Sequence, residues 1–325
     1  MQHSIGAPPC RLFVVGSFVE AHCWHVRCRP DSDESQSALA YERERAGKGL
    51  AVALGAHRLG AAVDLLLAVG HDDAGDRLLQ ILEQEGLDTS HVHRLGLRSG
   101  QGCGLIDARG DPAIVVYPGA NALLGLRELQ HAQSCLVRAA VVYAQLEVPP
   151  SLAAHALRQA RSAGAVTVLN PSPWPADGNF VDVFAAACVG VLNRSEAASL
   201  LRGLGLIGQP ELLDAVVLQA VWSHWQVGQW LVITLGANGC VAYARSGVVL
   251  RVPGIPVQVE QPVGAGDAFS AGLCALLAQG QPMAQALTFA NACGALAASR
   301  SGILTSLPQP QEVRAFLNQR APLDL

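Results

Sequence analysis

The sequence predicts an α/β fold in which a mostly parallel sheet lies between layers of helices. Short apolar runs rich in β-branched residues alternate with longer alanine- and leucine-rich stretches of helical periodicity. Half of the 325 residues are hydrophobic, which allows a large buried core. Ligands of such folds collect at the carboxyl ends of the strands, so the loops at those ends are the first candidates for a site.

The order of these patterns along the chain gives the expected elements. The apolar runs predict strands at residues 12–15, 63–68, 140–144, 166–169, 189–192 and 230–234. Helical periodicity predicts helices at residues 49–59, 74–85, 151–162, 196–201 and 211–224. Residues 17–46 and 96–119 are more polar and alternate as strands do, which predicts a small antiparallel layer projecting from the main sheet. Because no linker rich in proline, serine or charge divides the chain, we expect one domain over residues 1–325.

Composition and charge narrow the range of partners. The 22 basic and 26 acidic residues give a formal charge of −4, so we expect neither nucleic acid nor an anionic membrane as the main partner. The longest apolar runs are too short to span a bilayer, and residues 1–10 lack the pattern of a signal peptide. Nine cysteines at irregular spacings fit free thiols in a reducing compartment. We therefore expect a cytoplasmic protein.

Three motifs resemble a metal, dinucleotide or phosphate-loop site but lack what each of these sites requires. The first is the metal-like cluster His22, Cys23, His25 and Cys28. In an extended segment its ends lie roughly 20 Å apart, too far for one zinc ion. The glycines at positions 203, 205 and 208 match a dinucleotide fingerprint, but they follow a helix and so predict a helix end and a turn. Gly47-Lys48-Gly49 has neither the earlier glycine nor the following serine or threonine of a phosphate loop.

The segment Gly264-Ala265-Gly266-Asp267 is the strongest candidate for chemistry. Apolar residues at helical spacing follow it, so we expect a helix to begin at Gly264 or Ala265. The small residues leave the first amide N–H groups open to an anion, and the helix dipole favours a phosphate there. Asp267 in the first turn can accept a proton from an attacking hydroxyl. Taken alone, the pattern also fits a helix whose Asp267 only complements the dipole.

These segments resemble the ribokinase-like (PfkB) family of carbohydrate kinases along almost the whole chain. The stretch at 261–277 resembles the family's second signature, and Gly47-Lys48-Gly49 resembles its sugar-binding loop. Residues 118–122, 145–147, 170–173, 193–196 and 234–239 match further family motifs. The resemblance implies a three-layer sandwich with a mostly parallel central sheet, and a β-sheet lid over the sugar. The lid agrees with the two irregular regions at residues 17–46 and 96–119.

The resemblance also implies a role for each matching residue. Asp267 would be the general base, with an anion hole made by the backbone amides of Gly264, Ala265, Gly266 and Asp267. The substrate would contact Gly47, Lys48, Gly49, Glu147 and Asp267. ATP would bind at Asn193, Thr234, Leu235, Gly236, Gly239, Gly266 and Asn291. Glu196 would hold Mg²⁺ through water, because that ion gives up water reluctantly.

The positions that contact the sugar in ribokinases depart from the family pattern. Val19, Ala21 and Ala51 stand where ribokinases offer polar side chains to the sugar hydroxyls. None of the three can form a side-chain hydrogen bond, and each sugar hydroxyl left unpaired costs about 1–3 kcal/mol. Glu20 lies between two of them and is expected to point to the other face of the strand. The departures disfavour ribose and allow a more apolar acceptor.

A second departure concerns a monovalent cation. Potassium-activated members of the family carry an aspartate where this chain has Gln261. The other matching positions are Val263, Ala297, Arg300, Gly302 and Ser306. A neutral amide is a weaker cation ligand than a carboxylate, so K⁺ activation stays open.

The sequence therefore predicts a kinase that uses ATP and Mg²⁺ to phosphorylate a hydroxyl of a sugar or sugar-like molecule. A nucleoside kinase of the same fold and a non-catalytic ligand-binding homologue are the alternatives. Few basic residues lie near the predicted pocket, which argues against an acceptor that already carries a phosphate. The resemblance also implies a homodimer that forms through the lid.

Overall fold

A mostly parallel sheet forms the centre of the protein. The computed structural model describes residues 11–109, 112–175 and 181–319. Within them the main sheet has the strand order β13-β12-β11-β10-β9-β8-β1-β4-β5. Neighbours from β11 to β5 pair in parallel, whereas β12 and β13 form an antiparallel edge. The strands are β1 (Arg11–Val15), β4 (Ala62–Val69), β5 (Val92–Arg94), β8 (Val141–Gln145), β9 (Val166–Asn170), β10 (Val189–Asn193), β11 (Trp230–Thr234), β12 (Gly239–Ala244) and β13 (Val249–Pro253).

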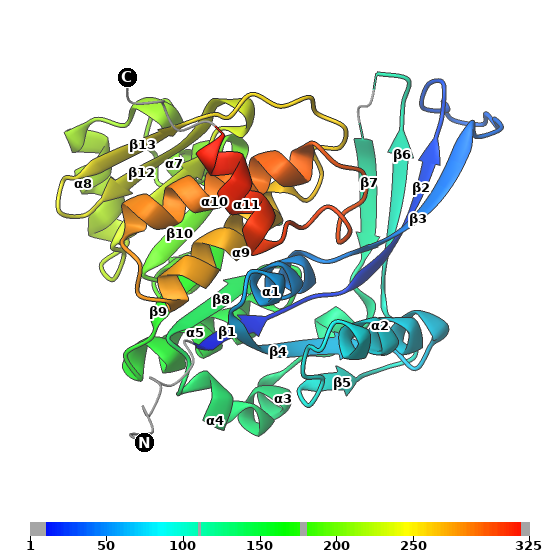
Figure 1. Cartoon of the computed structure of the whole chain (residues 1–325), viewed down its shortest axis with the longest axis horizontal. Coiled ribbons are helices and arrows are strands. Elements are labelled where there is room, and N and C mark those ends of the chain that lie inside the picture. The colour runs from blue at the N-terminus through cyan, green and yellow to red at the C-terminus, as the bar shows by residue number, and fades with distance from the viewer. Residues whose placement is uncertain (1–10, 110–111, 176–180, 320–325) are drawn as a thin grey trace.

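Helices cover both faces of this sheet (Figure 1). One face carries α1 (Lys48–Arg58), α2 (Asp73–Gln84), α9 (Ala265–Ala278), α10 (Met283–Ala298) and α11 (Pro310–Asn318). The other carries α3 (Leu126–His131), α4 (Gln133–Leu136), α5 (Pro150–Ser162), α6 (Val181–Phe184), α7 (Arg194–Gly203) and α8 (Ala215–His224). In β1, Leu12 and Val14 join the first core, whereas Phe13 and Val15 join the second. A central strand buried on both faces needs such a continuous apolar run.

A second sheet forms the lid. Its strands are β2 (Val19–His25), β3 (Ala40–Ala46), β6 (Gly100–Ile106) and β7 (Pro112–Tyr117), in the order β3-β2-β6-β7. Figure 1 shows these strands standing out from the body on the side where α1 and the loop before α11 lie. The expected lid segments at residues 17–46 and 96–119 therefore form one projecting sheet.

The lid is mixed, and the expectation of an antiparallel layer was wrong for its central pair. Strand β2 pairs in parallel with β6, while β3 and β7 pair antiparallel at the two edges. Both central strands leave the body, β2 after β1 and β6 after β5, and both outer strands return to it. Two outgoing strands that lie side by side must run parallel.

The six predicted strands are confirmed, each within a residue or two at its ends. The helix predicted at residues 211–224 is broken. A short 3₁₀ turn, η2 (Pro210–Leu212), precedes α8, and Leu213 between them donates its amide to the Tyr243 hydroxyl at 3.1 Å. Asp214 then caps α8 by accepting from the amide of Val217 at 2.9 Å.

Other segments differ from the sequence expectation in smaller ways. The hairpin β12–β13 was not predicted, and two further 3₁₀ turns are present, η1 (Gly119–Leu123) and η3 (Gly236–Asn238). Helix α7 ends at Gly203 and Gly205 follows with φ 69°, which confirms the predicted helix end and turn. Across the described ranges, no helix has the length and apolar character that membrane crossing requires. Residues 1–10, which bear on a signal peptide, lie outside the described residues.

Candidate active site

The Gly47-Lys48-Gly49 loop starts helix α1 against the end of β1. Gly47 has φ 121°, and a Cβ there would lie 2.2 Å from the Ser17 carbonyl oxygen. A Cβ on Gly49 would lie 2.3 Å from the Cα of Gly16. Both positions therefore require glycine, because the backbones of the loop and of β1 nearly touch. Lys48 between them is half-buried and begins the helix.

Glu147, just beyond β8, fixes this loop. Its Oε2 accepts from the Lys48 amide at 2.9 Å and from the Ser17 hydroxyl at 2.6 Å. The carboxylate thus joins three segments that are far apart in the sequence. Asn121 fixes the root of the lid in the same way, because its side chain accepts from Phe18 N at 3.0 Å and donates to Phe18 O at 2.7 Å.

Helix α9 begins at the predicted position, with Gly264 as its N-cap residue in the left-handed region at φ 90°. A Cβ on Gly266 would meet no atom within 4 Å, so open space lies over the first turn. The four amides of the segment are not equivalent. Ala265 and Asp267 donate to backbone carbonyls at 3.3 and 3.1 Å, and among the described residues the amides of Gly264 and Gly266 have no acceptor. These two are the donors best placed for an anion.

Two cavities meet at Lys48 and Asp267, which line both of them. The smaller cavity, about 280 Å³, lies between the lid and the body, and we call it the acceptor cavity. The larger one, about 700 Å³, lies between the start of α9 and the ends of β10 and β11, and we call it the nucleotide cavity. Gly47 and Glu147 line the acceptor cavity with them. The sequence-predicted substrate residues are thus brought together, apart from Gly49, whose role is packing.

Asp267 and Lys48 form the charged centre of this junction. Burial raises the pKa of Asp267 to about 6, the Lys48 ammonium opposes the rise, and the carboxylates of Glu147 and Glu196 add to it. The Asp267 carboxylate in turn raises the pKa of Lys48, against the effect of burial. Lys48 is therefore protonated at neutral pH, and Asp267 is mainly a carboxylate that needs little acid to become protonated.

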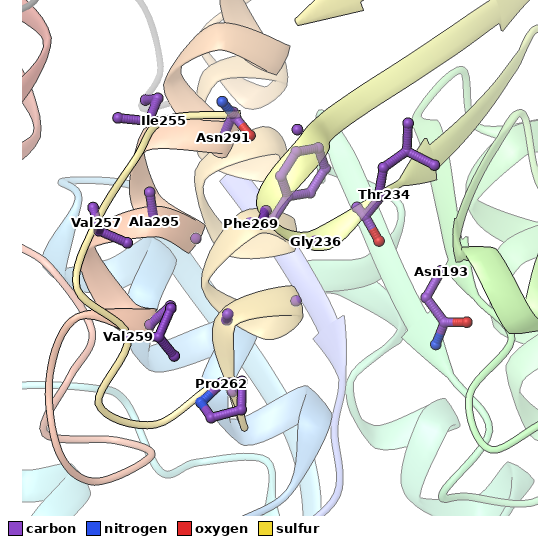
Figure 2. Close-up of a pocket in the computed structure, with 18 of the residues that line it drawn as sticks. Asn193, Thr234, Gly236, Ile255, Val257, Val259, Pro262, Phe269, Asn291 and Ala295 are labelled. Carbon is purple, nitrogen blue, oxygen red and sulfur yellow. The ribbon is translucent and has the colours of Figure 1, made fainter. Parts of the chain in front are cut away.

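The nucleotide cavity combines a polar side with an apolar side. In Figure 2 Asn193 and Thr234 lie across the cavity from Ile255, Val257 and Val259. Phe269 of α9 and Ala295 of α10 line it as well. The predicted cofactor residues Asn193, Thr234, Leu235, Gly236, Gly239, Gly266 and Asn291 all line this one cavity. An apolar slot with a few polar groups is the usual form of a cofactor site.

Several of these residues also have structural duties. Gly239 has φ 85°, and a Cβ there would lie 2.1 Å from the Val252 carbonyl oxygen, so the start of β12 requires glycine. A Cβ on Gly236, at φ 60°, would meet nothing within 4 Å. Asn291 donates its side-chain amide to Pro253 O at 2.9 Å, which ties α10 to the end of β13.

Glu196 is buried in the first turn of α7 as half of a capping box. Its Oε2 accepts from Asn193 N at 2.9 Å, and Asn193 Oδ1 accepts from Glu196 N at 2.8 Å. Asn170 contributes a longer bond to the same oxygen, at 3.4 Å. The other oxygen, Oε1, has no protein donor among the described residues. Glu196 itself does not line the nucleotide cavity, whereas Asn193, Arg194 and Ser195 beside it do. Its free carboxylate oxygen fits a hydrated Mg²⁺ held through water.

The polar side chains at the positions matched to a monovalent-cation site are engaged within the protein. The loops before α9 and after α10 do meet, but Gln261 Oε1 accepts from the Gly302 amide at 2.6 Å. The oxygen that would face a cation is therefore used within the protein. Arg300 pairs with Glu312 at 2.7 Å, and Ser306 donates to Ile303 O at 2.9 Å. Val263 lines the acceptor cavity, and Ala297 is buried in the core. We derive no step through such an ion.

The three departures from the sugar-contact pattern fall into two groups. Val19 and Ala21 line the acceptor cavity, as expected, whereas Ala51 is fully buried in the core and lines neither cavity. Glu20 points to the other face of β2, as predicted, and pairs there with Arg77 at 2.9 Å. Two of the three expected polar contacts are thus replaced by apolar cavity wall.

Sequence reasoning missed a pair of acids in the acceptor cavity. Glu42 and Glu44 of β3 line it, together with apolar residues of β7 such as Ile114 and Val116. The signal was present, since Glu42, Glu44 and Ala46 alternate along a strand that ends just before Gly47. The face toward which this strand points depends on its pairing with β2, which no local pattern gives.

Comparison with known proteins identifies the family and the fold. The model of the pfkB family carbohydrate kinases matches residues 11–310. The ribokinase of Haemophilus influenzae is 27% identical over 308 residues, which cover 94% of this chain and 98% of that protein. The ribokinase of Giardia lamblia superposes with a TM-score of 0.85 at 22% identity, over 97% and 100% of the two chains. The ribokinase of Arabidopsis thaliana complexed with ribose and ATP gives 0.81 at 21%, over 96% and 99%.

The fold has the ribokinase-like architecture, and the family match makes the protein a phosphotransferase. An α/β sandwich with a lid places one carboxylate and one ammonium between two cavities, one of them suited to a nucleotide. The family match spans most of the sequence. The chain belongs to the pfkB family of carbohydrate kinases, whose members transfer a phosphoryl group to an alcohol.

Proposed function

We propose that this protein is an ATP-dependent kinase that phosphorylates a hydroxyl of a sugar or sugar-like molecule, with Asp267 as the general base. The observation that supports this most is that Lys48 and Asp267 line both cavities. A phosphoryl group passing from the nucleotide cavity to an acceptor must cross that junction. Phosphoryl transfer requires in-line positioning and charge stabilisation, and both are available there.

Each group at the junction has a distinct part in the proposed reaction. The Asp267 carboxylate accepts the proton of the acceptor hydroxyl as its oxygen attacks the γ-phosphorus. The amides of Gly264 and Gly266 donate to the transferred phosphoryl oxygens, at the positive end of α9. The Lys48 ammonium adds a positive charge beside them. Glu147 holds Lys48 in place through the backbone amide.

ATP is the nucleotide we propose, and Mg²⁺ would accompany it. Glu196 at the start of α7 would hold the ion through water, with Asn193 at the same helix end. The ion would supply positive charge that offsets the charge of the phosphates. The apolar wall of Ile255, Val257 and Phe269 would face the base of the nucleotide.

The Asp267→Asn variant tests the proposal. Asn cannot accept the hydroxyl proton, so we expect kcat to fall about 10²–10⁴-fold with little change in ATP affinity. ADP release measured with a panel of sugars and nucleosides gives kcat, and calorimetry with ATP gives the affinity. Near-normal turnover by a folded Asp267→Asn protein contradicts the assignment of the base.

The same panel separates the two alternatives. The apolar Val19 and Ala21 favour a nucleoside as acceptor, and in that case the wild type phosphorylates nucleosides faster than free sugars. A non-catalytic binder binds ATP but releases ADP with no acceptor of the panel. Open space over Gly266 and Gly236, where an added Cβ would meet no atom within 4 Å, argues for a working nucleotide site.

We also propose a homodimer that forms through the lid. The edge strand β7 exposes four consecutive apolar side chains, from Ile114 at 57% to Val115 at 73% and Tyr117 at 60%. On the outer face of the lid Trp24 and Tyr41 lie with ring centroids 5.4 Å apart, and Tyr41 is 53% exposed. An exposed apolar edge strand needs a cover, and a second lid offers the matching surface.

A further inference from the structure

We propose that the acceptor carries a protonated amino group at the end remote from its reacting hydroxyl, and that Glu42 and Glu44 of the lid recognise it. The inference rests on the proposed function, because it takes the cavity beside Asp267 as the acceptor site. The cavity defines the site, and the two acids define which acceptor it prefers.

Strand register places the two acids on the inner face of the lid. Glu42 and Glu44 lie opposite Cys23 and Ala21 of β2, and all four line the cavity. Across β2, Cys23 and Ala21 pair in turn with Gly104 and Gly102 of β6. Those glycines pair with Ile114 and Val116 of β7. Because alternate residues of paired strands share a face, the acids form one side of a trough and the β7 residues form the other.

The middle of the trough is formed by small residues, with Ala21 and Cys23 of β2 opposite Gly102 and Gly104 of β6. Gly102 and Gly104 supply only backbone, and the nearest atoms to a Cβ added at either are side-chain atoms of Val19 and Cys23, both at 3.2 Å. Small residues in the two central strands therefore leave space for a ligand that reaches from the body up into the lid. The acids on β3 and the apolar residues on β7 are three strand spacings apart, roughly 14 Å, so a ligand in the trough lies between these two sides.

The charges around the cavity are strongly unbalanced. Its lining includes four carboxylates, those of Glu42, Glu44, Glu147 and Asp267, and among the described lining residues a single lysine or arginine, Lys48. Glu147 and Asp267 are the acids next to Lys48. Arg43 and Arg45 alternate with the lid acids and so point to the outer face.

The two lid acids have only weak partners within the protein. Glu44 Oε2 accepts from the Ile303 amide at a long 3.4 Å. Glu42 Oε1 lies 3.5 Å from His25 Nε2, which carries a charge only when that ring is protonated. Two carboxylates without a fixed cation favour a ligand that brings one, and they repel an acceptor that already carries a phosphate or a carboxylate.

Calorimetry with matched ligands tests the inference without relying on turnover. The probes are D-glucosamine against D-glucose and 1-amino-1-deoxy-D-fructose against D-fructose, with ribose 5-phosphate as the anionic probe, all in the presence of ADP. We expect the amine of at least one pair to bind about tenfold more tightly than its neutral partner. This is the gain in affinity expected from two partly exposed ion pairs. Ribose 5-phosphate should bind most weakly.

The double variant Glu42→Gln, Glu44→Gln removes both charges but keeps an oxygen for the Ile303 amide. It should reduce the amine preference to about twofold or less, because only hydrogen bonding remains. Glu34→Gln is the matched control, since this acid also belongs to the lid region but is exposed and does not line the cavity. The control should keep the full preference.

The outcomes separate this inference from the proposed function. Equal binding within both pairs, no binding of either amine, or a preference that survives in the double variant overturns it. A preference that holds while no acceptor is phosphorylated would instead contradict the kinase assignment and leave the recognition of the amine standing. If neutral acceptors are phosphorylated as fast as the amines, and the double variant does not change these rates, the kinase assignment stands and the inference about the amine is contradicted.

Discussion

The charge state of Asp267 decides whether this residue can act as a base. Its carboxylate sits beside the Lys48 ammonium and within the field of Glu147 and Glu196, and burial raises its pKa to about 6. A base with a pKa close to the working pH accepts a proton readily and is still ionised at neutral pH. The carboxylates of Glu147 and Glu196 therefore help to raise the pKa of Asp267 into the range that suits a base.

The pH profile of kcat/KM should report this carboxylate. As pH falls, Asp267 becomes protonated and loses its function as a base, so activity should be full above pH 7 and half-maximal near pH 6. Lys48→Met removes the ammonium that holds this pKa down, so the midpoint in the variant should move to higher pH, with lower overall activity. Steady-state kinetics from pH 5 to 9 measure both midpoints. An unchanged midpoint in the variant would show that another group titrates.

Helices α1 and α9 begin with glycine-containing segments that serve different purposes. At Gly49 the start of α1 is pressed against Gly16, and no side chain fits between them. At Gly266 the first turn of α9 faces open space. One glycine is required by packing, and the other leaves room for a ligand.

Alanine substitutions should separate these two purposes. Gly49→Ala forces a Cβ to 2.3 Å from the Gly16 Cα, so it should destabilise the fold by about 1–3 kcal/mol or more. Gly266→Ala should leave the melting temperature unchanged or slightly higher, because alanine is the better helix former, yet reduce turnover by filling the space at the free amides. Thermal melts and kcat measured on both variants check this. A stable Gly49→Ala protein, or a fully active Gly266→Ala protein, would contradict it.

Local patterns were sufficient to predict most elements, because each depends on its own residues. The buried strands are short apolar runs, and α9 begins where small residues precede helical periodicity. The prediction of one helix over residues 211–224 failed because the Leu213 amide donates to the hydroxyl of Tyr243, a residue thirty positions away. The prediction of an antiparallel layer failed for β2 and β6 for the same reason, since these two strands are far apart in the sequence and pair in parallel as they leave the body.

At the scale of the whole molecule, the candidate site forms where remote segments meet. Lys48 begins helix α1, Glu147 follows strand β8, and Asp267 lies in the first turn of helix α9. Each of these residues belongs to a motif that can be recognised in the sequence. The fold brings them together, because the ends of parallel strands lie at one edge of the sheet. Glu42 and Glu44 carry no motif and are placed only by the register of the lid. Recognition of the acceptor therefore depends on the part of the fold that is hardest to read from sequence.

The lid dimer gives a prediction for the assembled molecule. Val115 and Tyr117 are exposed on the outer face of β7, so the double variant Val115→Glu, Tyr117→Glu should place four like charges in a symmetric interface and convert a dimer to a monomer. Light scattering coupled to size exclusion measures the mass, and Ile207→Glu, at a 95% exposed site outside the lid, is the control. The monomer should also show a higher KM for the acceptor than the dimer, with a smaller change for ATP, because the lid lines the acceptor cavity and not the nucleotide cavity. A wild type that is already monomeric at micromolar concentration would contradict the dimer. A double variant that stays dimeric would show that the dimer forms through another surface.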